Sequence, residues 1–387
     1  MNTEGTQTAP NVVEDVFDGQ ATGVEVEDAG EDQAVIQKPW NPEQIRVSTS
    51  SFSLRNILDL IDEKSLELAP DFQRGQVWRT SQKSLLVESL LLQIPLPAFY
   101  FAEDSDGSFR VVDGLQRLST LHAFVRGADQ SFALTHLDHL QDLVGCRFAE
   151  LPVPFKRRIY NTQLIVNVID PSTPREVTYE IFKRINTGGT PLNAQEIRHC
   201  MSRPRSRDIL KRMTHTSAFD TATGERLKDH IRMNDREMAL RFAAFWLLGL
   251  ESYHERPVME NFLMEATEML DDPNRVPDDR VGALEAAFER AMTNGRLVFR
   301  EHAFRKWPLG ATGRSPINRA LFETWSIALA DYETDDIAVR RSDIVRSARK
   351  RMTTDFYYLD AITSSTADRR RVDYRFTAAA KDARAGL

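Results

Sequence analysis

The chain has 387 residues, of which 28% are charged and 41% hydrophobic, a composition typical of folded domains with substantial cores. Its two cysteines, Cys146 and Cys200, are too few for a disulfide framework and have no zinc-ligand spacing. There is no secretory signal and no apolar run of about 18 residues, so we expect a cytoplasmic protein with no membrane partner.

The net charge of −7 is unevenly distributed along the chain. Residues 1–38 contain nine acidic residues and one basic residue, so the rest of the chain has a net charge of +1 and includes local basic clusters. Because residues 1–38 contain few large apolar side chains, we predict a disordered acidic tail. Two roles remain open for this tail: a solubilising segment, which we favour, or an autoinhibitory mimic of DNA lying over a basic groove.

Residues 39–215 show the mixed patterns of an α+β domain with a small sheet. Apolar residues at helical spacing predict helices over 51–61 and 81–92. Two strands, 98–102 and 109–112, are separated by a hairpin turn, and a continuous apolar run predicts a central strand over 164–169.

The turn after the second of these strands carries three polar groups, Asp113, Gln116 and Arg117, at the start of a predicted helix. A helix N-terminus attracts anions, Gly114 allows close approach of a ligand to the backbone, and Arg117 can grip a phosphate. Asp113 is the candidate ligand for Mg²⁺ or the group that orients a water molecule. The alternative is that Asp113 only caps the helix and Arg117 is a solvated surface residue.

Two other segments contain candidate phosphate-binding groups. Upstream, Arg74 is a candidate supported by Gln73, with a structural ion pair between Arg74 and an acid such as Asp113 as the alternative. Downstream, a glycine-rich loop lies between two helices that begin with capping boxes, so its backbone N–H groups could face a phosphate, although Gly-Gly after a helix is usually a C-cap. The candidates around this loop are Arg184, Asn186, Thr187, Gly188 and Gly189.

A basic cluster follows this loop and suits contacts to a DNA backbone, with a solvated basic face as the alternative. Its members are Arg198, Arg203, Arg205, Arg207, Lys211 and Arg212. Residues 216–387 are predicted to form an all-helical domain, with a helix from Asn234 and further helices near 257–270, 280–304, 316–331 and 341–352. The late basic stretch 368–375 is interpreted as a DNA or partner contact or as the start of a disordered tail.

Three sequence blocks together resemble one protein family. They are Pro70-Asp-Phe-Gln-Arg-Gly-Gln-Val-Trp78, the Asp113-Gly-Leu-Gln-Arg117 turn, and the run from Phe182 to Arg198. In this order they resemble the N-terminal domain of the GmrSD-type modification-dependent restriction enzymes, whose signature is Asp-Gly-Gln-Gln-Arg. Here Leu115 replaces the first glutamine.

The resemblance implies a ParB/sulfiredoxin-like fold that binds and hydrolyses a nucleoside triphosphate in defence against phage or modified foreign DNA. It supports Asp113, Gln116 and Arg117 as catalytic residues, and it places Arg184 and Asn186 in or near the site. Mg²⁺ and a nucleoside triphosphate are the expected cofactors, because phosphoryl transfer depends mainly on charge and positioning. DNA, a separate nuclease subunit and a second copy of the chain are the expected partners.

Three other functions remain open at this point. A ParB-like protein could bind nucleotide or DNA as a switch without turnover, since only one candidate catalytic carboxylate is evident. A metal-dependent nuclease could use Asp113 and nearby acids on DNA. A toxin–antitoxin or scaffold component with a vestigial pocket is the third. The chain has no P-loop motif, so a P-loop NTPase is excluded.

Overall fold

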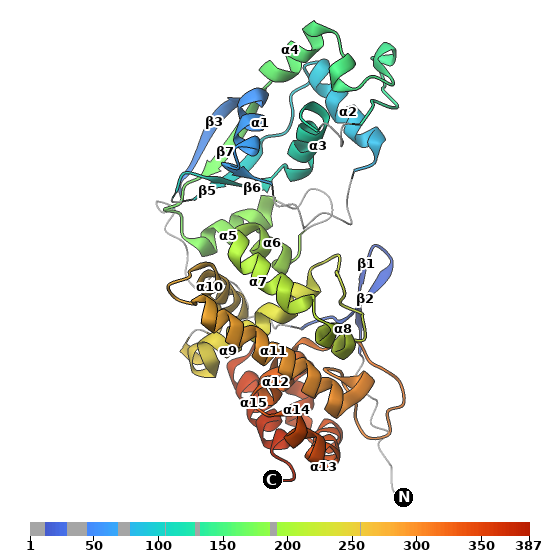
Figure 1. The fold of residues 1–387 in the computed structure, drawn as a ribbon, viewed down its shortest axis with the longest axis vertical. Helices are drawn as coiled ribbons and strands as arrows, with labels where there is room; N and C mark the ends of the chain where they lie inside the picture. The colour runs from blue at the N-terminus through green and yellow to red at the C-terminus, as the bar shows by residue number, and fades with distance from the viewer. Residues whose placement is uncertain are drawn as a thin grey trace, which may run out of the picture. The chain divides into compact units, whose positions relative to one another are not determined.

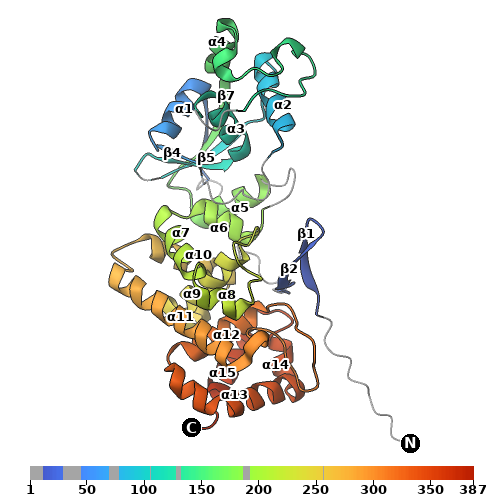
Figure 2. The same cartoon turned by 45° about the vertical axis from the view of Figure 1, so that its right-hand side comes forward.

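The computed structural model describes residues 12–28, 45–68, 78–104, 106–127, 132–185, 192–255 and 257–387. The chain divides into two compact units. We call the unit that contains the described residues from 45 to 201 the sheet unit, and the unit formed by residues 12–28 and 202–387 the helical unit. Figures 1 and 2 show the elements of each unit.

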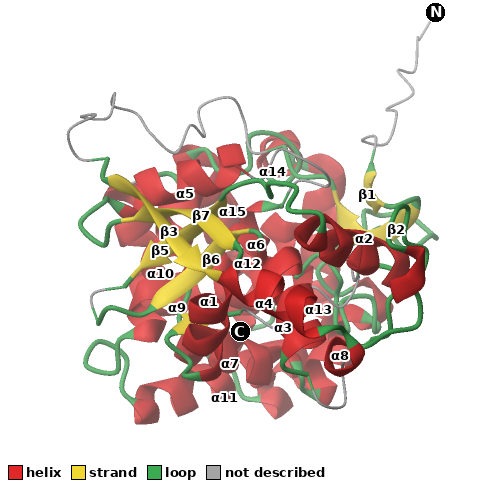
Figure 3. Ribbon diagram, turned by 90° about the horizontal axis from the view of Figure 1, so that it is seen from above, coloured by secondary structure: helices red, strands yellow, loops and turns green. Residues whose placement is uncertain are grey.

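A mixed five-stranded sheet organises the sheet unit, in the order β3-β7-β5-β6-β4. The strands are β3 (Val47–Ser53), β4 (Leu66–Glu67), β5 (Phe99–Glu103), β6 (Phe109–Asp113) and β7 (Gln163–Ile169). The central strands β7 and β5 run parallel, whereas β3 pairs antiparallel with β7 and β6 antiparallel with β5. Figure 3 shows the strands in yellow.

The strand that we predicted over 164–169 corresponds to β7. It lies inside the sheet, between β3 and β5, as its continuous apolar run indicates.

The sheet unit contains six helices among its described residues. They are α1 (Leu54–Asp62), α2 (Thr80–Leu91), α3 (Leu115–Val125), α4 (Val153–Asn161), α5 (Arg175–Ile185) and α6 (Ala194–Met201), with short 3₁₀ turns at Gln141–Leu143 and Phe148–Glu150. The first helix begins at Leu54 rather than Ser51, because residues 51–53 pair with β7 and the Ser53 hydroxyl caps the helix at the Asn56 N–H. Apolar side chains from β5, β7, α1, α2 and α3 form one core.

The helical unit is built from α7 onward. Its helices are α7 (Pro204–Thr214), α8 (Ser217–Thr223), α9 (Asn234–Glu255), α10 (Met259–Asp271), α11 (Asp278–Phe299), α12 (Arg319–Ala330), α13 (Thr334–Thr354), α14 (Phe356–Ala361) and α15 (Arg369–Ala383), with a 3₁₀ turn η5 at Arg300–His302. The α+β class with a helical C-terminal region is confirmed. No described helix combines the length and the apolar character that crossing a membrane requires.

The two units divide between Met201 and Ser202 rather than between residues 215 and 216 as we predicted. The reason is that α7 packs on α9, α10 and α11, so it belongs to the helical unit. The start of α7 is also fixed there, because the Asp271 carboxylate accepts hydrogen bonds from the backbone N–H groups of Arg203 (2.9 Å) and Ser206 (3.0 Å).

We predicted that residues 1–38 form a disordered tail, and this prediction is wrong for residues 12–28. These residues form a hairpin of β1 (Glu14–Phe17) and β2 (Gln20–Glu25), and Val24 is fully buried in the core of the helical unit. Their acidity misled the prediction, because two of the acids are buried ion-pair partners. Glu25 pairs with Lys306 at 2.5 Å, and Glu27 pairs with Arg241 at 2.6 Å.

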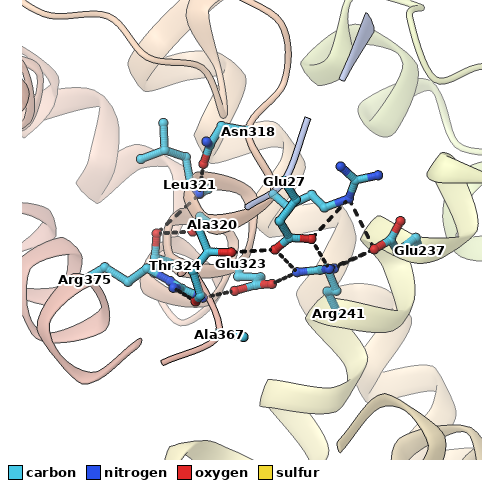
Figure 4. A network of polar contacts seen from close by, with 12 residues as sticks. Glu27, Glu237, Arg241, Asn318, Ala320, Leu321, Glu323, Thr324, Ala367 and Arg375 are labelled. Atoms are coloured by element: carbon cyan, nitrogen blue, oxygen red, sulfur yellow. Dashed lines mark hydrogen bonds and ion pairs between the residues drawn. The ribbon is translucent and has the colours of Figure 1, made fainter. Parts of the chain in front are cut away.

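The ion pairs of Glu27 continue into a buried network (Figure 4). Arg241 also contacts Glu237 at 2.9 Å and donates to Glu323, whose other oxygen pairs with Arg375 at 2.5 Å. Arg375 and Glu323 are completely buried. We interpreted residues 368–375 as a DNA or partner contact or as the start of a disordered tail. They instead form the N-cap, Asp368, and the first half of α15, and Arg375 is buried in the core.

Candidate functional site

The candidate turn lies where β6 ends and α3 begins. Asp113, the last residue of β6, is opposite Tyr100 of β5, and a register shift between Tyr100 and Phe101 leaves Val112 without a partner on β5. Such bulges re-aim the side chains beside them. Gly114 follows in the left-handed region, with φ of 96°, and is the N-cap of α3.

Gly114 lies directly against the ring of Phe99. A Cβ atom on residue 114 would be 2.3 Å from Cδ1 of Phe99, which is far below any real contact distance. Phe99 is itself completely buried. The backbone at the start of α3 therefore approaches the sheet more closely than any other residue type would allow.

The side chain of Arg117, in the first turn of α3, points back toward the strand ends of the sheet. Its Nη2 donates to Asp113 Oδ2 at 2.7 Å and to the Ala98 carbonyl at 3.2 Å, while Nη1 donates to the Pro97 carbonyl. The guanidinium carbon lies 4.2 Å from the centre of the Phe99 ring. Burial lowers the pKa of Arg117, and the neighbouring Asp113 carboxylate acts in the opposite direction.

This geometry excludes the alternative of a capping Asp113 beside a solvated Arg117. No side chain of the described residues caps α3, and the Arg117 side chain is only 13% exposed. The geometry also changes the role predicted for Arg117, because much of its donor capacity is already used within the fold. Arg117 holds Asp113 in place, and a second contact to an anion would have to use its remaining N–H groups.

Asp113 is the accessible member of the pair. Its side chain is 33% exposed, and Oδ1 receives no hydrogen bond from the described residues. Gln116 lies in the first turn of α3, and its Oε1 atom is buried without a hydrogen-bond partner among the described residues. One turn therefore presents a fixed carboxylate oxygen, an unsatisfied amide oxygen and the uncapped start of a helix.

The other predicted phosphate-binding residues are distributed differently. Gln73, Arg74, Asn186, Thr187, Gly188 and Gly189 lie outside the described residues. Arg184 is in the last turn of α5, with its side chain 74% exposed and its Nε 3.8 Å from Glu180. Both α5 and α6 contact β6, the strand that ends at Asp113.

The predicted DNA-binding residues are divided between the two units. Arg198, in α6 of the sheet unit, is buried, and its Nε donates to Gln195 at 3.0 Å. Arg205 donates to the carbonyls of Leu270 and Val276 and pairs with Asp278, so it serves the α10–α11 connection. Arg212 pairs with Glu285.

Arg203, Arg207 and Lys211 complete this set, on α7 or directly before it. Arg203 is exposed, whereas Arg207 and Lys211 are half-buried.

The described residues contain no group of three or more His, Cys, Asp or Glu side chains placed so that they could hold a metal ion. A protein-only metal cage would need such a cluster, but a Mg²⁺–nucleotide complex does not, because phosphates and waters supply most of the oxygens. The single carboxylate Asp113, with the Gln116 amide oxygen nearby in the chain, is a donor set of the second kind.

Sequence reasoning missed Phe99 and the carbonyls of Pro97 and Ala98. The one indication was that side chains of a strand point alternately to its two faces, which puts Phe99, the first residue of β5, on a buried face. Backbone carbonyls leave no trace in side-chain patterns, so the acceptors of Arg117 had no sequence signal.

A model of one protein family matches residues 56–201, and its description is "GmrSD restriction endonuclease, N-terminal domain". No curated protein and no solved structure matched the chain. All three sequence blocks that carry the resemblance lie inside the matched range. Leu115, the departure from the signature, is 9% exposed and packs in the core of the sheet unit, so it serves packing where the signature has an amide. Residues 56–201 thus belong to the GmrSD N-terminal domain family.

Proposed function

We propose that the sheet unit binds a nucleoside triphosphate with Mg²⁺ at the Asp113 turn and hydrolyses it, as part of a restriction-type defence against phage or modified foreign DNA. The observation that carries the chemistry is the Asp113–Arg117 pair. Arg117 fixes one carboxylate oxygen at 2.7 Å and leaves the other without a bond from the described residues, beside the uncapped N-terminus of α3. The family description carries the biological role.

We assign a role to each residue of the turn from the contacts that it makes. Asp113 holds the metal ion or orients the attacking water, and Arg117 positions Asp113 by a charge-assisted hydrogen bond. Gln116 offers its buried Oε1 atom to a water molecule or to the metal ion. The N–H groups at the start of α3 and the close approach at Gly114 suit a phosphate. When bound, Mg²⁺ neutralises charge on the phosphate oxygens.

The rest of the phosphate contacts are assigned to Arg74, Gln73 and the 186–189 loop on the family resemblance. Arg184 is close to this loop in sequence, and its guanidinium is exposed, with Nε 3.8 Å from Glu180. In this proposal DNA is the target, a separate nuclease subunit supplies the cleavage, and the protein works in the cytoplasm, alone or as a homo-oligomer.

A ParB-like switch without turnover is the second candidate. The observation in its favour is that Asp113 is the one carboxylate in the stretch 109–124, with no second acid or base beside it in the sequence. Nucleotide binding would then need only the phosphate contacts, and the bound state itself would be the signal.

The test is phosphate release from ATP, GTP, CTP and UTP with Mg²⁺, with and without duplex DNA. Asp113→Asn keeps the shape of the side chain and removes its charge, so we expect release to fall by about 100-fold or more. Arg117→Lys should lower release by disturbing Asp113. Asp104→Asn is the matched control, because Asp104 pairs with Arg110 at 2.7 Å in the same hairpin and should not affect release.

Each result separates the candidates. Release that is lost in Asp113→Asn and kept in Asp104→Asn supports the NTPase. Binding by calorimetry without release supports the switch. If wild type neither binds nor hydrolyses any of the four nucleotides, both candidates are wrong.

A further inference from the structure

Four arginines gather in the helical unit near the C-terminal end of α8. Arg226 follows Gly224, the left-handed C-cap of that helix, and Arg296 is in the last turn of α11. Arg305 follows η5, and Arg314 is on the exposed loop that leads to α12. These four residues, which we call the arginine cluster, are far apart in the sequence and come from four different segments.

The geometry around Gly224 brings two guanidinium groups together. A Cβ atom on residue 224 would lie 3.2 Å from Nη1 of Arg314 and 3.9 Å from Nη2 of Arg305. These two nitrogens are therefore at most 7.1 Å apart, the sum of the two distances. Arg226 lies beside β2, where its Cβ is 3.1 Å from the position of a Cβ on Gly23. Figures 1 and 2 both show β2 close to α8.

No acid among the described residues pairs with Arg305, the buried member of the cluster. Arg305 is 3% exposed, and its guanidinium donates to two neutral carbonyls, those of Thr223 (2.5 Å) and Ala303 (2.8 Å). Burial first, and then the like charges of Arg314, Arg226 and Arg296, lower the pKa of Arg305 to about 10.

The outer arginines are also without acidic partners in the described part of the chain. Arg226 and Arg314 are exposed, Arg296 is half-buried, and none of the three forms an ion pair with a described residue. Two acids lie close to the cluster in sequence. Glu225 directly precedes Arg226 and is exposed, and Glu301 forms an ion pair with His302 at 3.6 Å and also interacts electrostatically with Arg296.

Such an arrangement is unfavourable for the fold by itself. The chain has more acidic than basic residues, 57 against 50, yet none of the described acids forms an ion pair with Arg305, Arg314 or Arg226. One arginine is enough to satisfy the carbonyls of Thr223 and Ala303. The three further arginines repel Arg305, and a bound anion would relieve that repulsion.

We propose that the arginine cluster binds the phosphate backbone of duplex DNA. Guanidinium groups bind phosphate oxygens in pairs, and several of them on one surface fit a row of phosphates rather than a single small anion. The choice of DNA as the polyanion rests on the proposed function. The surface itself replaces the set around α7, of which Arg198 and Arg205 are already used inside the fold.

The experiment measures binding of a fluorescein-labelled 30-base-pair duplex to the full chain by anisotropy, without nucleotide, at several salt concentrations. The test variant is Arg226→Ala with Arg314→Ala, since both side chains are exposed. The control is Arg346→Ala with Lys350→Ala, which removes the same charge from the exposed face of α13. Thermal unfolding of every variant accompanies the binding assay.

For the test variant we expect Kd to rise on the order of 10-fold at about 0.1 M salt, and the slope of log K against log salt to fall by about 1.8, for two lost phosphate contacts. Its melting temperature should stay the same or rise, because repulsion around Arg305 is relieved. The control should keep the Kd and slope of wild type.

Equal losses in the test and control variants would overturn the proposal, as would no loss in either. Wild type that does not bind the duplex, or binds only duplex RNA, would also overturn it. Since no nucleotide is added, this failure is distinct from loss of phosphate release at Asp113.

Discussion

At the scale of the residue, Gly114 occupies a position that disfavours any side chain for two independent reasons. Its φ of 96° is in the left-handed region, and the Phe99 ring fills the space where a Cβ would be. Phe99 also supports the Arg117 guanidinium on its face. Because Gly114 has no side chain, the end of β6, the Phe99 ring and the start of α3 can lie in direct contact.

Replacing Gly114 with alanine should destabilise the sheet unit. The left-handed backbone costs roughly 1–2 kcal/mol, and the overlap with Phe99 adds roughly 1–3 kcal/mol. Gly107→Ala is the matched control, because Gly107 has φ of 81° but nothing within 4 Å of an added Cβ. Urea unfolding of both variants measures the difference, and equal losses would mean that Phe99 moves away without cost.

The sequence predicted that polar residues meet at this turn but not the contacts that they make there. Asp113, Gln116 and Arg117 stand out because three polar groups open an apolar helix. The direction of Arg117 depends on the carbonyls of Pro97 and Ala98, which come from a strand end brought close by the sheet. Such acceptors are set by tertiary packing and cannot be deduced from side-chain spacing.

At the scale of the element, the first turn of α9 contains a carboxylate whose burial disfavours its ionised form. Asp235 is 2% exposed, and its Oδ1 has no hydrogen-bond partner among the described residues. Burial raises the pKa of Asp235 to about 6, against the opposing effect of Arg236. The folded protein therefore resists ionisation of this group more than the unfolded chain does.

The sign of the pH effect follows from this raised pKa. Below about pH 4 the group is protonated in both states, and between pH 4 and 6 ionisation favours the unfolded chain. We expect Asp235→Asn to match wild type near pH 4 and to be more stable at pH 7 by roughly 2–3 kcal/mol. Chemical denaturation at the two pH values tests this, and a pH-independent difference would contradict it.

Periodicity predicted most elements but missed α15. The helices near 257–270, 280–304, 316–331 and 341–352 correspond to α10 to α13, with shifted ends. In α15, by contrast, charged side chains point inward, and Arg375 is completely buried against Glu323. A pattern based on apolar residues cannot detect a helix whose core contact is an ion pair.

At the scale of the whole molecule, the N-terminal hairpin belongs to the helical unit although the sheet unit lies between them in the sequence. Glu27 is the main ionic contact of this segment with α9. Burial raises the pKa of Glu27, but Arg241 and then Arg319 more than offset this, and the pKa is lowered overall. Glu27 therefore contributes stability above its ordinary pKa that is lost as the pH falls through its lowered value.

Glu27→Gln should destabilise the helical unit at pH 7 by about 3 kcal/mol, since Arg241 loses a buried charge partner. The difference from wild type should shrink below about pH 4.5, where the unfolded chain binds protons at this position. Asp18→Asn is the control, because Asp18 is exposed in the β1–β2 turn and the change should have no effect beyond about 0.5 kcal/mol. Circular dichroism during urea titration measures both variants.

The discontinuous helical unit has a consequence for protein synthesis. The Thr366 hydroxyl donates to the Glu27 carboxylate across a sequence separation of 339 residues. At a synthesis rate of about 5–20 residues per second, the N-terminal hairpin waits roughly 20 to 70 seconds on the ribosome for this partner. The sheet unit is translated completely within that interval, so it is able to fold first, and the helical unit can close only after Thr366 and α15 have been synthesised.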